Sequence, residues 1–173
     1  GTLEIKGGVG YYGITYNASG NSSEGIIQNT GSGEILILGG ESGDSGIQYL
    51  SYNGSTGIIS NGTNGILTIK GAKGNGINYG AYTIDSYKET SAQIQNYGIL
   101  KITGGESGDI LDLSYGIGTL AHGRGSYGTI ENWNKLFISG SAYTHGINLI
   151  TYNGGVGKII NNKASTLTIS GCL

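Results

Sequence analysis

Short runs of alternating apolar and polar residues, separated by glycine, recur along the whole chain. The clearest run has the form apolar-x-Ile-x-Gly. Its alternation places Leu and Ile on one face of a β-strand, and Lys, Thr, Ser or Glu on the other. Six copies occupy 3–7, 35–39, 67–71, 100–104, 136–140 and 167–171, at intervals of 32, 32, 33, 36 and 31 residues. A period this constant indicates an internal structural repeat.

Two further units lie within each period. A Gly-x-Ile-x-Asn unit ends at Asn29, Asn61, Asn96, Asn132 and Asn161, with Ala92 replacing the glycine in the third copy. A Gly-Ile-x-Tyr unit occupies 13–16, 46–49 and 76–79, and becomes Gly-Ile-x-Leu at 146–149. Its fourth copy can be placed either near Gly108 or at Gly116. Each period therefore contains three short strands separated by glycine-rich turns.

Three strands per period distinguish between the solenoid classes. Leucine-rich repeats have one strand in 20–29 residues, and nonapeptide calcium rolls need a repeating Gly-Gly-x-Gly-x-Asp motif that this chain lacks. The rival is a β-sandwich, because Asn53-Gly54, Asn61-Gly62 and Asn153-Gly154 are typical hairpin turns. A sandwich, however, requires no constant period. We predict an all-β, right-handed parallel β-helix, or β-solenoid, with about five coils of ~32 residues and three short strands per coil. We interpret 1–173 as a single solenoid segment of a longer repeat protein.

Composition narrows the possible partners. The chain has 36 glycines and no proline, and its charged residues amount to 12% with a net charge of −2. It therefore lacks the basic stripe of a nucleic-acid surface, and no apolar run approaches the ~18 residues of a membrane span. The single cysteine, Cys172, predicts no internal disulfide. We expect no nucleic-acid partner, no membrane insertion of this segment, and no cofactor or metal.

The five asparagines of the Gly-x-Ile-x-Asn units are predicted to be structural. Stacked coils would place them about 4.8 Å apart, one per coil. Side-chain amides at this spacing both donate and accept along the stack, so they can form a ladder where the strands end. A polar strip that holds sugars is the functional alternative.

Tyrosines are concentrated in the middle third of each coil. They are Tyr16, Tyr49, Tyr52, Tyr79, Tyr82, Tyr87, Tyr115, Tyr143 and Tyr152. One interpretation is a set of stacked rings that stabilise neighbouring coils. The other is an exposed Tyr-rich face that contacts carbohydrate or protein.

The acidic and histidine residues give no pattern typical of catalysis. The sequence Gly-Gly-Glu-Ser-Gly-Asp occurs at 39–44 and again at 104–109. The copies lie two coils, or about 10 Å, apart, so we interpret them as acidic turns and not as one calcium site. The 11 acidic residues do not repeat on neighbouring strands of one face, as glycoside hydrolysis would require. His122 and His145 have no suggestive nucleophile or acid nearby and are expected in solvated loops. We predict no catalytic residue.

One coil is longer than the others. The interval from Leu100 to Leu136 is 36 residues, and its expanded portion includes Asp109, Asp112, His122 and Arg124. Insertions in solenoids map to loops, often on the binding face. These four residues are therefore the first candidates for a binding loop.

The three units together resemble the β-helical passenger repeats of bacterial autotransporters and related large surface adhesins. This resemblance implies a stalk on the outside of the bacterial outer membrane or secreted from the cell, with adhesion, autoaggregation or toxin delivery as its role. It also implies a host-surface protein or glycan, further copies of the chain, or neighbouring coils of the parent chain as partners. We expect a non-enzymatic structural or adhesive segment. The alternatives are a β-helical carbohydrate-active enzyme or phage-type spike, and a toxin-like passenger.

Overall fold

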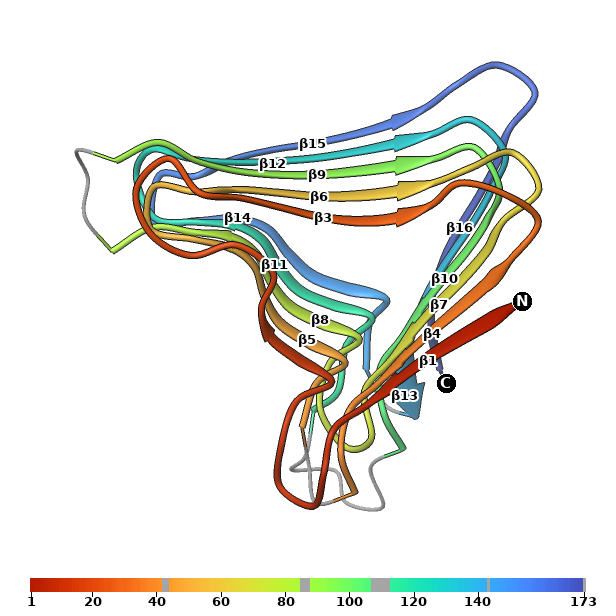
Figure 1. The fold of residues 1–173 in the computed structure, drawn as a ribbon. Helices are drawn as coiled ribbons and strands as arrows, with labels where there is room; N and C mark the ends of the chain where they lie inside the picture. The colour runs from red at the N-terminus through yellow and green to blue at the C-terminus, as the bar shows by residue number, and fades with distance from the viewer. Residues whose placement is uncertain (42–43, 85–87, 107–112, 143, 173) are drawn as a thin grey trace.

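The computed structural model describes residues 1–41, 44–84, 88–106, 113–142 and 144–172. Within these ranges the chain forms sixteen β-strands and no helix. The strands wind into a β-solenoid of about five coils, and each coil contributes one strand to each of three parallel sheets, A, B and C (Figure 1). In this view sheet C crosses the top, sheet A runs down the right, and sheet B bends inward on the left. The predicted β-solenoid is confirmed.

Successive coils stack in chain order in all three sheets. Sheet A contains β1 (Thr2–Lys6), β4 (Glu34–Leu38), β7 (Ile66–Lys70), β10 (Ile99–Thr103), β13 (Lys135–Ala142) and β16 (Thr166–Cys172). Sheet B contains β2 (Ile14–Tyr16), β5 (Ile47–Tyr52), β8 (Ile77–Tyr82), β11 (Ile117–His122) and β14 (Ile147–Tyr152). Sheet C contains β3 (Glu24–Asn29), β6 (Thr56–Asn61), β9 (Thr90–Asn96), β12 (Ser126–Asn132) and β15 (Val156–Asn161).

Equivalent positions of the repeat pair with one another across coils. In sheet A, Ile37 pairs with Ile69, and Ile69 pairs with Ile102. The same register places the fourth Gly-Ile unit at Gly116, because Ile117 pairs with Ile77 on one side and with Ile147 on the other. A shift of one residue would turn every inward side chain to solvent, so the buried face determines the register.

The core is a continuous column of aliphatic side chains inside the three sheets. Ile37, Ile69 and Ile102 of sheet A are fully buried, and they join one cluster with Leu50 of sheet B and Ile94 of sheet C. Full burial of such a side chain contributes about 1.5–3 kcal/mol. Each short strand is therefore stabilised by its neighbours above and below and by the two facing sheets.

The five asparagines form a hydrogen-bonded ladder where the strands of sheet C end. Each Nδ2 donates to the Oδ1 one coil further along: Asn29 to Asn61 at 3.2 Å, Asn61 to Asn96 at 2.9 Å, Asn96 to Asn132 at 2.8 Å, and Asn132 to Asn161 at 2.8 Å. The same amides also donate to backbone carbonyls of the following corner. The ladder thus satisfies polar groups that the corner buries beside the core.

The Asn-Gly pairs turn corners and do not close hairpins. Asn53 (φ 46°) and Gly54 (φ 89°) adopt left-handed conformations between β5 of sheet B and β6 of sheet C. Asn153 (φ 51°) and Gly154 (φ 82°) do the same between β14 of sheet B and β15 of sheet C. These strands belong to different sheets, which excludes the sandwich alternative.

Candidate functional site

Seven aromatic rings form one continuous surface on the outer side of sheet B, here called the tyrosine face. Its members are Tyr16, Tyr49, Tyr52, Tyr79, Tyr82, His122 and Tyr152. The first row stacks Tyr16 on Tyr49 at 5.1 Å and Tyr49 on Tyr79 at 5.3 Å between ring centroids. The second row continues through Tyr52, Tyr82, His122 and Tyr152, with centroid distances of 5.8, 4.4 and 4.9 Å. Such spacing is within the favourable range for aromatic pairs.

A bend in each strand of sheet B brings the two rows together. In a straight strand, Tyr49 and Tyr52 would point to opposite faces and lie about 10 Å apart. Here their ring centroids are 5.0 Å apart in an edge-to-face contact. The two residues between them, Leu50 and Ser51, are both fully buried, so consecutive side chains point inward at the bend. The inward bend of sheet B is visible in Figure 1.

Stacking determines which part of each ring meets solvent. Face-to-face neighbours cover both flat sides of Tyr49 and Tyr82 inside the rows, so these two rings present their edges and hydroxyl groups. Burial, reinforced by neighbouring phenols, raises the pKa of Tyr52 and Tyr79 above the ordinary 10.0. These phenols therefore stay protonated and able to donate a hydrogen bond at neutral pH. Tyr16 and Tyr152, at the ends of the rows, are each 48% exposed.

His122 is not the solvated loop residue that the sequence predicted. It is the last residue of β11, pairs with Tyr82 and Tyr152, and takes the place of a tyrosine in the second row. Its Nδ1 is buried and has no hydrogen-bond partner among the described residues. Burial lowers the pKa of His122 below its ordinary value of 6.5. The imidazole is therefore neutral at neutral pH and acts as an aromatic ring.

We expect His122 to make the fold sensitive to mild acid. Because its pKa is lower in the folded chain, the unfolded chain binds the proton first as the pH falls below about 6.5, and stability declines until the folded pKa is passed. The loss should stay below about 1 kcal/mol, because the site is partly open to solvent. Urea midpoints of wild type and His122→Tyr between pH 7.5 and 5 would measure it. A parallel decline in both proteins would contradict the assignment.

Of the other candidate binding-loop residues, Arg124 does not belong to this surface. Asp109 and Asp112 lie outside the described residues. Arg124 is exposed in the corner after β11, between Gly123 (φ 91°) and Gly125 (φ 85°). Thirteen residues separate β10 from β11, against eight between β4 and β5. The expansion thus precedes β11, whereas His122 is the last residue of β11 and Arg124 follows the strand, so these two residues lie outside the expanded portion in which they were predicted.

The described glutamates of the repeated acidic turns pair with lysines. Lys6 Nζ lies 3.5 Å from Glu41 Oε1, and Lys70 Nζ lies 3.4 Å from Glu106 Oε1. Each lysine belongs to the coil before its glutamate. Exposed pairs of this kind contribute little to stability. Among the described residues, His, Cys, Asp and Glu form no group of three or more placed to hold a metal ion.

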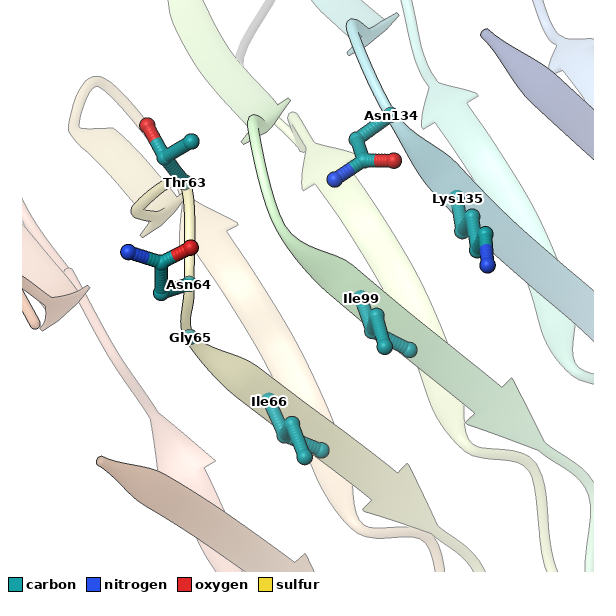
Figure 2. Close-up of a pocket in the computed structure, with 7 residues that line it drawn as sticks. All are labelled: Thr63, Asn64, Gly65, Ile66, Ile99, Asn134 and Lys135. Atoms are coloured by element: carbon teal, nitrogen blue, oxygen red, sulfur yellow. The ribbon is translucent and has the colours of Figure 1, made fainter. Parts of the chain in front are cut away.

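A second surface feature is a notch at the corner between sheets C and A. Four residues (30–33, 62–65 and 162–165) span this corner in three coils, but only two (97–98 and 133–134) span it in the two coils between them. The short corners leave a pocket of about 290 Å³, here called the corner notch. It is lined by Thr63, Asn64, Gly65, Ile66, Ile99, Asn134 and Lys135 (Figure 2).

Two aromatic residues that the sequence analysis did not single out occupy the short corners. Tyr97 and Trp133 each follow a ladder asparagine, and their rings stack at 5.9 Å with an interplanar angle of 13°. The signal in the sequence was the distance from each ladder asparagine to the next strand, which shortens only in these two coils.

Comparisons with protein-family models, with curated proteins and with solved structures find no match to this chain. No helix within the described ranges is long and apolar enough to cross a membrane. The class is therefore defined by the fold and its surfaces: a three-sided β-solenoid with an aromatic face on sheet B and a notch between sheets C and A.

Proposed function

We propose that this chain is a non-enzymatic, adhesive β-solenoid segment of a bacterial surface or secreted protein, in which the coils form a stalk and the tyrosine face contacts the partner. The observation that carries the proposal is the continuity of seven rings over five coils. The resemblance of the repeat units to autotransporter passengers and large adhesins supports the same role and the cell-surface location.

The physical character of the face fits contact with a protein or glycan surface. Tyrosine is enriched at interfaces because it combines apolar area with a polar tip and few rotatable bonds. Here neighbouring coils already immobilise the rings, so little further side-chain entropy is lost on binding. The phenols and the neutral imidazole carry no charge at neutral pH, which favours hydrogen bonding over ionic contact.

Thr119 suggests substitutions that should leave the fold intact. It occupies the position of Tyr49 and Tyr79 in the fourth coil, paired directly with Tyr79. The double variant Tyr49→Thr/Tyr79→Thr therefore removes two central rings while keeping a residue that the repeat already accepts. In sheet A, Thr68 pairs with Leu36 on one side and with Lys101 on the other, and this outward row continues to Phe137. The double variant Leu36→Thr/Phe137→Thr therefore introduces a residue that this row already contains, and it is the matched control on another face.

We expect beads coated with the double tyrosine variant to bind cultured epithelial cells, or one another, at least about fivefold less than wild-type beads, as for the loss of interface hot spots. The sheet A control should bind as wild type does. Counting bound and clustered beads by flow cytometry, with circular dichroism to verify folding, would measure both effects. Equal binding by all three proteins, or wild-type binding no higher than that of albumin-coated beads, would refute the proposal.

A further inference from the structure

The corner between β14 and β15 contains an Asn-Gly step that differs from the others in the chain. The sequence has five such steps, at 53–54, 61–62, 64–65, 75–76 and 153–154. Asparagine followed by glycine is prone to deamidation, because the next backbone nitrogen can attack the side-chain amide and glycine has no Cβ to obstruct its approach. The reaction therefore needs a glycine nitrogen that is not engaged in a hydrogen bond and an amide that can move.

In four of the five steps the glycine nitrogen donates a hydrogen bond. Gly54 N donates to Thr90 Oγ1 at 2.8 Å, Gly62 N to the carbonyl of Asn29 at 2.8 Å, Gly65 N to the carbonyl of Gly62 at 2.9 Å, and Gly76 N to the carbonyl of Tyr115 at 3.0 Å. Two of the preceding amides are held as well. Asn61 is fully buried in the ladder, and Asn75 Nδ2 donates to Asn78 Oδ1 at 2.7 Å. These corners have to open before their asparagines can react.

Asn153 and Gly154 are not restrained in this way. Both residues are exposed, and within the part of the chain that the structure describes neither the Asn153 side chain nor the Gly154 nitrogen makes a hydrogen bond. The hydrogen bond that closes this corner runs from Gly155 N to the carbonyl of Tyr152 at 3.2 Å and involves neither reacting group. A Cβ added at Gly154 would meet no atom nearer than 3.8 Å, so the corner has room to rearrange.

We propose that Asn153 is a site of spontaneous covalent modification, at which the chain forms a succinimide and then aspartate or isoaspartate. The Gly154 nitrogen gives up its proton to solvent and attacks Cγ of Asn153. The bond from Cγ to Nδ2 breaks, and the nitrogen leaves as ammonia after taking a proton from water. A second water molecule then opens the succinimide at either of its carbonyls, so water is the only co-reactant.

The modification changes the surface beside the tyrosine face. The amide is neutral, whereas aspartate and isoaspartate each add one negative charge to a chain whose formal net charge is −2. The new carboxylate directly follows Tyr152, the exposed end of the second row of rings. Isoaspartate also routes the backbone through the side-chain methylene, which lengthens the corner between sheets B and C. The reaction is a property of this corner and does not depend on the adhesive function.

Incubation of the folded protein at mildly alkaline pH, followed by peptide mapping with mass spectrometry, measures all five steps in one sample. We expect Asn153 to react at least about fivefold faster than each of the other four asparagines, because at each of those steps at least one hydrogen bond has to break first. In urea the five corners are unfolded, and the five rates should become similar. Modified protein should also elute later from an anion-exchange column.

Thr90→Val tests the cause of the selectivity, because it removes the acceptor of Gly54 N and keeps the shape of the side chain. We expect the rate at Asn53 to rise about fivefold while the rate at Asn153 stays unchanged, with circular dichroism verifying the fold. Asn153→Ser is the control that should remove the fastest reaction. The proposal is overturned if another asparagine of the folded chain reacts as fast as Asn153, if Asn153 reacts only in urea, or if Thr90→Val leaves the rate at Asn53 unchanged.

Discussion

Replacing Asn96 with alanine is expected to lower the free energy of unfolding by about 3–4 kcal/mol. Asn96 is fully buried at the centre of the ladder and accepts from Asn61 at 2.9 Å. It donates to Asn132 at 2.8 Å and to the carbonyl of Lys135 at 2.8 Å. Alanine would leave these buried groups without a partner, and each such group costs about 1–3 kcal/mol.

The measurement is the urea midpoint and slope for each protein at one pH. Asn161→Ala is the matched control, because Asn161 is exposed and accepts from Asn132 while donating to the carbonyl of Ser165. Water can replace these partners, so we expect a loss of about 1 kcal/mol or less. Equal losses at the two positions would show that the ladder contributes nothing beyond an ordinary exposed hydrogen bond.

Gly57→Ala is expected to destabilise the chain by at least about 3 kcal/mol. A Cβ at this position would lie 2.0 Å from the backbone carbonyl oxygen of Leu50 and 3.2 Å from its Cγ. A backbone oxygen cannot rotate away as a side chain can, so strands β5 and β6 would have to separate. Overpacking of a core by a single methyl group costs about 1–3 kcal/mol even where side chains can move.

Two other positions make this expectation specific. Gly31 has no atom within 4 Å of an added Cβ, so Gly31→Ala should change the urea midpoint little. Ala92 occupies the position of Gly57 in the third coil and is buried. There the corner before the strand is longer, seven residues (83–89) against three (53–55), and Gly80 replaces Leu50. A neutral Gly57→Ala would mean that the two strands can separate without cost.

The regular repeat made most of the fold predictable. The pairing of Ile37, Ile69 and Ile102 follows from their 32- and 33-residue spacing, because an apolar residue in a two-residue alternation has only one face to bury. The ladder positions follow in the same way, since an asparagine at one place in every coil must stack on itself. The fourth Gly-Ile unit was ambiguous only because insertions change the local count while the strands still pair.

The surfaces were much less predictable. His122 was expected in a solvated loop, because no nucleophile or acid lies near it in the sequence, yet it stacks between Tyr82 and Tyr152. Its place depends on the bend at Leu120 and Ala121, and nothing in the alternation of the strand indicates that two consecutive residues point inward. The corner notch was missed because it arises from the absence of residues, two fewer in each of two corners.

By itself the sequence determined the period, the inward face of each strand, the parallel stacking and the ladder, because these properties repeat and each copy constrains the next. Only the tertiary structure decided which outward residues meet. The bend of sheet B brought Tyr49 and Tyr52 together, and the short corners brought Tyr97 and Trp133 into a stacked pair. Burial of an apolar face acts on every coil alike, whereas the surface depends on the angle and length of each individual corner.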